Sequence, residues 1–344
     1  MVELLELHDP AGAFDAVEAF LAEELRPGLV ADLYLGYGLS QSLRREAAPP
    51  PPEPCPLPLA ACRIRLEAEP APAARGTFRA GEWEQTWAPE DYAAGVEAVR
   101  AAIARGDVYQ VNLVQHLSAP ADGDPARLAE LLAPLRPLHP RPFAGDGWAI
   151  VSASPELFLA RHGDRLVTKP IKGTRPAGED VDDLKDAAEH VMIVDLERND
   201  LSRVCEAGSI RWPELMVQQE LAGVTHLVST VEGTLRAGVG LAEILAALHP
   251  GGSITGAPKV SAVDHIARIE PVGRGASMGA LGTVRANGDF SLALTIRTFA
   301  IAAGRIHLWV GGGIVWDSEP EAEIEESWVK ARPLLSLVGG LVPA

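Results

Sequence analysis

The segment "GALGTVRANGDFSLALTIRTFAIAAG" (residues 279–304) indicates which kind of fold the chain adopts. Two strand-like runs flank the short turn "ANGD", Ala286 to Asp289. Turns built around Asn-Gly join neighbouring antiparallel strands, because both residues tolerate a positive φ. The segment therefore predicts an antiparallel hairpin within a larger sheet.

The rest of the chain does not alternate strands and helices regularly. Further strand-like runs are 29–40, 108–119, 148–154, 157–163, 165–171, 226–235 and 305–315, and residues 61–86 alternate weakly. Helical runs are 9–25, 89–107, 182–205, 241–248, 258–268 and 319–332, and the last is expected to begin at Pro320 and end at Pro333. This order predicts an α+β class with large antiparallel sheets and not a parallel βαβ fold.

The run 108–119 shows the alternation of a strand most clearly. Tyr109, Val111 and Leu113 would share one face, and Gln110 would lie on the other. We therefore expect one apolar and one polar face along this strand.

Composition indicates a globular protein without a membrane span. The chain has 344 residues, 47% of them hydrophobic, and a formal net charge of −17. No run of about 18 apolar residues is present, and the acidic N-terminus lacks the basic region of a signal peptide. Three cysteines form no CxxC pair, which is typical of the reducing cytoplasm. The negative charge disfavours nucleic-acid binding, and an anionic substrate would need a local basic cluster.

The C-terminal helical run carries one of two candidate metal sites. Glu323, Glu326 and Lys330 fall on one helix face at i, i+3 and i+7. One interpretation is an acidic first turn with a Glu326–Lys330 surface pair. The other is a carboxylate that binds a hard cation beside an ammonium that binds an anion.

The helical run 182–205 is also acidic and contains Glu189 next to His190. Its charged residues could form a solvated face, although "RNDLSRV" is unusual surface sequence because Asn and Asp disfavour helix interiors. The zinc motif HExxH is absent, so a metal here would be carboxylate-bound Mg²⁺. The glycine-rich turns "HPGGSITGAPKV" (249–260) and "VGGG" (310–313) match no nucleotide motif and are compatible with tight turns alone.

Lys172 in "KPIKGT" (169–174) is one of only five lysines among 30 basic residues. Arginine would supply the same charge, but it stays protonated and is a poor nucleophile. An amine at this position is therefore compatible with covalent chemistry, while a simple contact with a substrate carboxylate is the alternative.

Eight blocks together resemble the chorismate-utilising enzymes. They are "GDVYQVNLVQ" (106–115), "SASPELFL" (152–159), "KPIKGTRPAG" (169–178), "EHVMIVDLERNDLSRV" (189–204), "THLVSTVEG" (225–233), "HPGGSITGAPKV" (249–260), "TIRT" (295–298) and "GGGIVWDSEPEAEIEESWVKA" (311–331). They occur in family order over about residues 85–335. The resemblance implies an α+β fold, a single large domain of two antiparallel-rich sheets packed together with helices outside. It also implies a chorismate-binding catalytic core at 85–338, preceded by a short region 1–84 with a proline-rich connection (47–60) in the same fold.

Two positions sort the members of this family. At the position of Gln110, isochorismate and salicylate synthases have a lysine that activates water. This chain lacks that lysine, so a hydroxylating activity is not expected. Anthranilate synthases usually read "PIAGT" where this chain reads "PIKGT". Lys172 therefore resembles the aminodeoxychorismate synthase branch, which aminates chorismate at C4 on the way to p-aminobenzoate and folate.

The resemblance implies a role for each remaining site residue. Lys172 would be the nucleophile, Glu156 the general acid and His226 a neighbour of the reacting carbons. Mg²⁺ would be held by Glu189 and Glu326, with Glu323 close by. Substrate contacts would come from Arg297, Lys330, Gly312, Gly313, Thr174, Thr255 and Gln110, and Lys259 is a doubtful neighbour that could be structural.

The same resemblance implies chorismate and ammonia as substrates and a separate glutaminase subunit as the source of ammonia. Two alternatives remain open on the sequence. One is an anthranilate synthase component, which would give the ortho amine. The other is a non-catalytic family member that acts as a scaffold for a partner.

Overall fold

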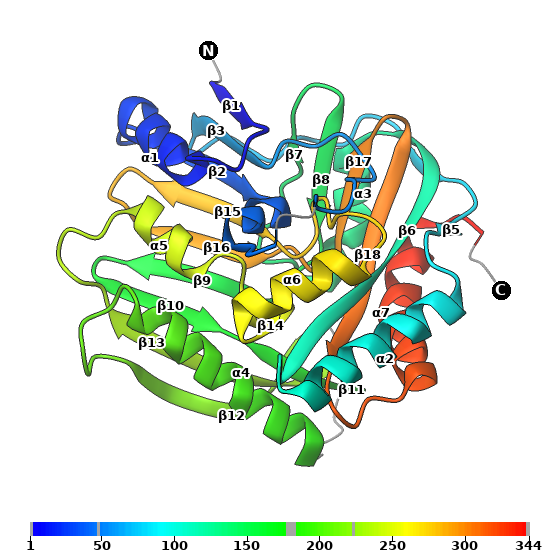
Figure 1. Ribbon diagram of the computed structural model, residues 1–344. Coiled ribbons are helices and arrows are strands. Elements are labelled where there is room, and N and C mark those ends of the chain that lie inside the picture. Colours follow the sequence, from blue (N-terminus) through cyan, green and yellow to red (C-terminus); the bar gives the residue numbers. More distant parts are fainter. Residues whose placement is uncertain (1–2, 47–48, 177–183, 222–223, 342–344) are drawn as a thin grey trace.

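The computed structural model describes residues 3–46, 49–176, 184–221 and 224–341, and the side chains of a few residues bordering these gaps are not described. Over these residues the chain forms two antiparallel sheets with helices around them (Figure 1). The predicted α+β class with two large antiparallel sheets is therefore confirmed.

The first sheet has ten strands over the described residues. In spatial order they are β1 (Leu4–Leu7), β3 (Ala60–Leu66), β2 (Leu29–Leu35), β15 (Ala280–Arg285), β16 (Phe290–Leu294), β9 (Leu157–His162), β10 (Arg165–Lys169), β13 (Val224–Thr234) and β11 (Ile171–Pro176), and β12 (Arg211–Leu221) also pairs with β13. The N-terminal strands join this sheet where β2 pairs with β15.

The second sheet has eight strands in the described part of the chain. Its order is β14 (Gly256–Ala257), β6 (Gln110–Gly123), β18 (Arg305–Ile314), β17 (Thr298–Ala302), β8 (Trp148–Ser152) and β7 (Phe143–Ala144), and β4 (Phe78–Ala80) and β5 (Glu84–Gln85) also pair with β6. Its centre is the long β6–β18 pair, in which Gly312 lies opposite Leu113.

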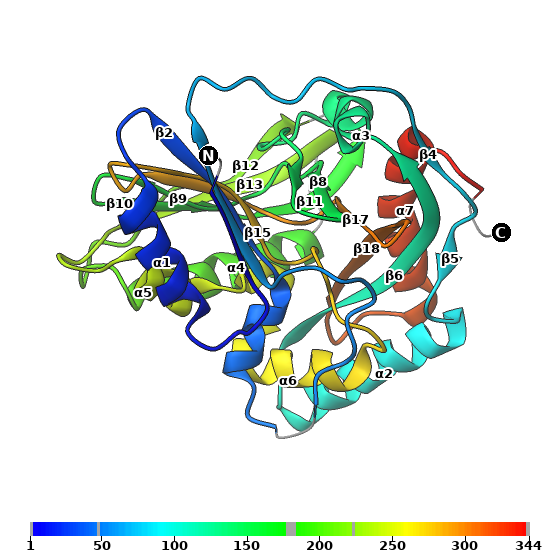
Figure 2. The same ribbon diagram turned by 90° about the horizontal axis from the view of Figure 1, so that it is seen from above.

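Helices cover the outer faces of both sheets (Figures 1 and 2). They are α1 (Ala13–Glu24), α2 (Pro89–Arg105), α3 (Pro125–Leu132), α4 (Leu184–Ser202), α5 (Leu241–Leu248), α6 (Lys259–Ile269) and α7 (Pro320–Val338), with short 3₁₀ turns η1 (Tyr37–Leu43), η2 (Ala133–Leu135) and η3 (Gly252–Ile254). No helix in the described ranges is long and apolar enough to cross a membrane.

The main hydrophobic core lies between the sheets, because residues of both contribute to it. Leu33 and Leu292 come from the first sheet, and Leu113 and Trp309 from the second. A second core lies on the other side of the eight-stranded sheet, where β17 and β18 pack against α3 and α7. The eight-stranded sheet is thus buried on both faces, which explains why the first ten residues of β6 are all buried instead of alternating.

The hairpin predicted around "ANGD" is confirmed by β15 and β16, which pair antiparallel from Ala280 to Leu294. Gly288 adopts a φ of 85°, a left-handed conformation that costs a residue with a side chain about 1–2 kcal/mol. The turn closes with a hydrogen bond from the Arg285 amide to the Asp289 carbonyl at 2.8 Å.

Three expectations for single elements are wrong. The strand expected over 29–40 ends at Leu35, where η1 begins after Gly36. Tyr109 precedes β6 and is 71% exposed, so it does not share a buried face with Val111. The last helix does not end at Pro333 but continues to Val338.

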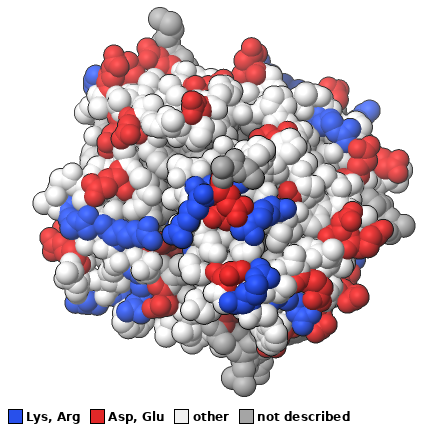
Figure 3. Space-filling view, viewed as in Figure 1, with Lys and Arg blue, Asp and Glu red and all other residues white. Residues whose placement is uncertain are grey.

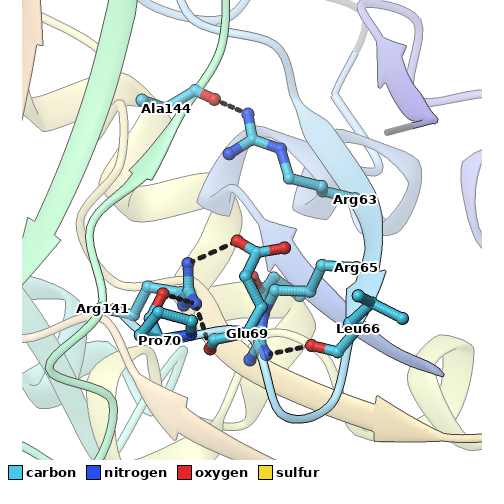
Figure 4. A network of polar contacts seen from close by, with 8 residues as sticks. Arg63, Arg65, Leu66, Glu69, Pro70, Arg141 and Ala144 are labelled. Atoms are coloured by element: carbon cyan, nitrogen blue, oxygen red, sulfur yellow. Dashed lines mark hydrogen bonds and ion pairs between the residues drawn. The ribbon is translucent and has the colours of Figure 1, made fainter. Parts of the chain in front are cut away.

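Polar contacts also tie the N-terminal strands to the loop before β7 (Figure 4). Arg141 donates to Glu69 Oε1 at 3.2 Å and to the carbonyls of Glu69 and Pro70 at 2.8 and 2.6 Å. Arg63 on β3 donates to the carbonyl of Ala144 on β7. These bonds connect the edges of the two sheets.

Candidate active site

One carboxylate oxygen binds both a lysine and an amide, and the three side chains come from three different elements. Lys172 Nζ on β11 lies 3.0 Å from Glu189 Oε1 on α4. Gln110 Nε2, at the start of β6, donates to the same oxygen at 3.1 Å. The side chains of Lys172 and Glu189 are only 18% and 14% exposed, so this ion pair is stronger than a surface pair.

A bulge in β11 determines where Lys172 points. The register between β11 and β13 shifts between Lys172 and Arg175. Gly173 has a φ of 62°, which explains why a glycine follows the lysine. His226 Nδ1 on β13 donates to the Gly173 carbonyl at 2.7 Å and so holds the bulge in place. Burial lowers the pKa of His226 and Arg297 adds to this, while the Gly173 carbonyl opposes it.

Glu156 is a buried acid beside this group. It directly precedes β9 and is 6% exposed. Ser253 Oγ donates to its Oε1 at 3.2 Å. Burial raises the pKa of Glu156 to about 7, although Lys172 and Arg297 oppose the shift. A fraction of Glu156 therefore still carries its proton near neutral pH, as a general acid must.

Arg297 approaches Glu156 from a strained backbone. It lies between β16 and β17 with a φ of 50°, a conformation that costs a non-glycine residue about 1–2 kcal/mol. Burial lowers the pKa of its guanidinium, and the nearby Glu156 opposes that shift. Strain of this kind is retained where surrounding structure or function requires the geometry.

Gly312 of β18 faces the acidic side of α7. A Cβ at Gly312 would lie 3.2 Å from Glu326 Oε1, 3.4 Å from Lys330 Nζ and 3.5 Å from Glu323 Oε2. Lys330 Nζ binds Glu326 Oε1 at 2.7 Å and the Gly311 carbonyl at 2.8 Å. A side chain at this strand position would therefore fill the space between β18 and these groups.

Gly313, the next residue of β18, lies against Gln110 and Glu189. A Cβ there would lie 1.9 Å from Gln110 Nε2 and 2.8 Å from Glu189 Oε1, so only glycine fits. Glu189 thus lies beside Gly313, while Glu326 and Glu323 lie beside Gly312.

These residues are compatible with Mg²⁺, which needs few protein ligands. Within the described residues no three His, Cys, Asp or Glu side chains lie close enough to form a metal cluster by themselves. Mg²⁺ usually takes one or two carboxylates and completes its shell with water and substrate oxygens. Glu189 and Glu326 offer that donor set, and the glycines leave room beside it. In this structure Lys172 and Lys330 balance the charge of these two carboxylates.

For the remaining predicted residues, the structure shows contacts that stabilise the fold or does not describe the side chain. Thr255 is fully buried, and its hydroxyl donates to the Gly251 carbonyl at 2.7 Å, so it stabilises the turn. Thr174 lies in β11, but its side chain is outside the described part of the structure. Lys259 binds Asp200 Oδ2 at 2.5 Å and the Leu248 carbonyl at 2.9 Å. These contacts favour the structural role that the sequence offered as an alternative.

Sequence reasoning missed two buried polar residues, Ser253, which binds Glu156, and Glu197 on α4. Ser253 lies in the glycine-rich turn 249–260, whose sequence matches no nucleotide motif and gave no reason to single out this serine. Glu197 is 4% exposed although it was assigned only to an acidic helix. A signal was present, because Glu197 lies in the apolar stripe formed by Val194 and Leu201 at helical spacing. An acid within such a stripe must be buried.

Comparisons with known proteins agree on one family. The sequence profile described as chorismate binding enzyme matches residues 22–336. The chain is 42% identical over 264 residues to anthranilate synthase component 1 1 of Haloarcula marismortui, covering 72% of this chain and 53% of that protein. It is 41% identical over 269 residues to aminodeoxychorismate synthase component 1 of Klebsiella aerogenes, covering 74% of this chain and 59% of that protein.

The structural comparison gives the same architecture. Anthranilate synthase component I from Streptococcus pneumoniae superposes with a TM-score of 0.78 at 27% identity, covering 90% of this chain and 81% of that one. The chain spans between 53% and 59% of the length of the two curated relatives. Relatives named for two different aminations are thus similar to this chain to the same degree.

Proposed function

Since this chain belongs to the family of chorismate-binding enzymes, we propose that it aminates chorismate at C4 to give 4-amino-4-deoxychorismate. The observation that carries this proposal is the position of Lys172, whose amine binds the carboxylate of Glu189 at 3.0 Å and whose charge also acts on the buried acid Glu156. An amine and a protonated acid on one substrate are what a substitution at an allylic hydroxyl requires.

Substrate binding would use the cationic and glycine-lined parts of the site. Chorismate is a dianion, and Arg297 and Lys330 supply positive charge in a chain whose net charge is −17. The backbone of β18 at Gly312 and Gly313 carries no side chain that would block the approach of a carboxylate. Glu189 and Glu326 would hold Mg²⁺, which would act as a Lewis acid on the ring carboxylate and so make C2 more electrophilic.

The chemistry then has two substitutions. The amine of Lys172 adds to C2 while the ring double bonds shift and the C4 hydroxyl leaves. Glu156 gives its proton to that oxygen, which departs as water. Ammonia next adds at C4, the double bonds shift back, and the lysine leaves from C2 as its amine. The ring carbons keep their oxidation level, and the net reaction exchanges a hydroxyl for an amino group.

Lys172 explains why the product would be the para amine. If the lysine occupies C2 first, ammonia is directed to C4. Without it, ammonia would attack C2 directly and give the ortho product. The Gln110 amide, which binds Glu189, replaces the lysine that a hydroxylating enzyme would use at that position.

Anthranilate formation is the second candidate, because relatives with that name are as similar to this chain as the others. In that case Lys172 would only neutralise Glu189, as its ion pair in this structure also permits. The "component 1" in the relatives' names motivates a further proposal, that a separate glutaminase supplies the ammonia. We further propose a cytoplasmic role in p-aminobenzoate and folate synthesis.

The test is to identify the product formed by the purified protein from chorismate, Mg²⁺ and ammonium, without an added lyase. Chromatography with mass detection separates 4-amino-4-deoxychorismate from anthranilate. We expect the former. Anthranilate as the main product would favour the second candidate, and no turnover would favour a non-catalytic scaffold.

A further inference from the structure

Arg274 is a buried cation that the proposed chemistry does not use. On the face of the molecule shown in Figure 3, lysine and arginine side chains lie beside acidic ones at the surface, where ion pairs contribute little. Arg274 is instead only 1% exposed, and its partner Glu270 is 5% exposed. Arg274 Nε and Nη2 donate to Glu270 Oε2 and Oε1 at 2.9 and 2.7 Å. A pair buried to this extent needs further hydrogen bonds to offset its desolvation.

Those further bonds go to two backbone segments of the candidate site. Arg274 Nη1 donates to the Ile254 carbonyl in η3 at 3.0 Å, and Nη2 donates to the Asn112 carbonyl in β6 at 2.7 Å. Glu270 Oε1 also accepts the Val114 amide of β6 at 3.1 Å. One guanidinium therefore fixes the turn η3 against the strand β6.

Each of these segments continues into the site through a neighbouring residue. Ser253 directly precedes Ile254, and its hydroxyl donates to Glu156 Oε1 at 3.2 Å. Asn112 pairs with Gly313, one of the glycines that line the site. From the guanidinium to the acid, the chain of contacts thus consists of one hydrogen bond, one peptide link and the serine hydroxyl.

The loop that carries this arginine is held on both sides of it. Trp309 Nε1 of β18 donates to the Gly273 carbonyl at 3.0 Å. The described part of the proline-rich segment supplies two more contacts: the Pro52 carbonyl accepts the Gly273 amide at 2.8 Å, and Glu53 Oε2 accepts the Gly275 amide at 2.9 Å. These bonds restrict the directions in which the arginine side chain can extend.

We propose that Arg274 is a positioning residue for the general acid, because it holds η3 where the Ser253 hydroxyl binds the Glu156 carboxyl. This inference rests on the proposed function. Lysine cannot take the same part, since an ammonium lacks the planar fork that reaches Glu270 and both carbonyls at once. Arg274→Lys therefore keeps the positive charge but releases η3, and Ser253 is no longer held on Glu156.

The loss of the serine contact changes the pH at which Glu156 ionises. Burial raises the pKa of Glu156 to about 7, and the Ser253 hydroxyl is one of the groups that oppose this shift. Without that hydroxyl the pKa rises further, so the protonated, active form persists to higher pH. The other groups that face this carboxyl are Lys172 of β11, Arg297, Glu197 of α4 and the Ile171 amide. Within the described residues, Arg274 makes no hydrogen bond or ion pair with any of them.

The test compares pH profiles of kcat at saturating chorismate and constant free ammonia. We expect Arg274→Lys to lower kcat about tenfold, because a displaced acid loses part of the about 10²–10⁴-fold that general acid catalysis contributes. The KM for chorismate should change less than about twofold, and the alkaline limb should move to higher pH. Arg65→Lys is the matched control, since Arg65 binds Asp32 through two nitrogens and is 11% exposed. It should keep the wild-type profile.

Ser253→Ala should move the alkaline limb in the same direction, and adding Arg274→Lys to it should move the limb no further. An unmoved limb in Arg274→Lys, or a further shift in the double variant, would overturn the proposal. If Arg274→Lys does not fold, Glu53→Ala replaces it, because this change removes the acceptor of the Gly275 amide from the outer side of the loop. The limb should then move the same way to a smaller extent, and an unmoved limb counts equally against the proposal.

The product of the wild type distinguishes this inference from the function on which it rests. Anthranilate would contradict the proposed function but leave the pH profiles comparable, because the C4 hydroxyl leaves in both aminations and needs an acid. An inactive wild type would contradict both.

Discussion

The carboxyl group of Glu156 changes its charge close to neutral pH, because burial raises its pKa to about 7. If it is the general acid, the protonated form is the active one. We expect kcat to fall as pH rises above about 7, approaching tenfold per pH unit. The profile should be measured at constant free ammonia, since ammonium also loses its proton as pH rises.

Glu156→Gln provides the corresponding variant. It should lower kcat by about 10²–10⁴-fold, because the amide cannot protonate the leaving oxygen. A pH profile that stays flat across neutrality in the wild type would show that Glu156 is not the acid.

Glu326 allows the metal proposal to be tested at a single residue. Glu326→Gln should raise the Mg²⁺ concentration needed for half-maximal activity by about tenfold, since a carboxylate is a much better ligand than an amide. Glu325→Gln is the matched control, because Glu325 is the neighbouring residue and pairs with Arg332 at 2.7 Å on the surface. If both variants need the same Mg²⁺ concentration for half-maximal activity, Glu326 is not a ligand.

Some residues of the candidate site could be identified from the sequence, and others could not. Lys172 could be singled out because lysine is rare here and an amine has chemistry that arginine lacks. Its partner Glu189 could not be paired with it from spacing, since β11 and α4 meet only through tertiary packing. Glu197 was missed because an acidic helix suggests a solvated face, whereas tertiary contacts bury it.

At the scale of elements, the bulge in β11 is the feature that aims the nucleophile. Gly173→Ala should cost about 1–2 kcal/mol of stability, because its φ of 62° is unfavourable for a residue with a Cβ. It should also lower kcat by displacing Lys172 from Glu189. Denaturant unfolding and steady-state kinetics measure the two effects.

Gly163→Ala separates these effects. Gly163 has a nearly equal φ of 64° and lies in the turn between β9 and β10, where an added Cβ would meet no other group within 4 Å. This variant should lose similar stability but keep its kcat. Equal kcat values for both glycine variants would show that the bulge does not position the lysine.

The sequence predicts a helix or strand well where local residues determine its ends. It predicts less well where tertiary packing determines them. The "ANGD" hairpin follows from its turn residues. Pro333 was expected to end α7, since proline in a helix costs about 3 kcal/mol. The helix continues because Leu334, Leu335 and Val338 are buried in the second core, and each such side chain contributes about 1.5–3 kcal/mol.

At the scale of the whole molecule, the site exists only because both sheets and two helices converge. Lys172 belongs to the ten-stranded sheet and Gly313 to the eight-stranded one, while α4 and α7 contribute Glu189 and Glu326. The class of this fold follows from its antiparallel signals. The pairing of β2 with β15 joins segments more than 240 residues apart, and no local pattern specifies it.

The covalent role of Lys172 is best tested by comparing the product made by Lys172→Ala with that of the wild type. Chorismate, Mg²⁺ and excess ammonium are supplied to both proteins, and the amines are identified by chromatography and mass spectrometry. We expect 4-amino-4-deoxychorismate from the wild type, and from the variant either a loss of most activity or a shift to the ortho amine. Undiminished para amination by Lys172→Ala would contradict that role.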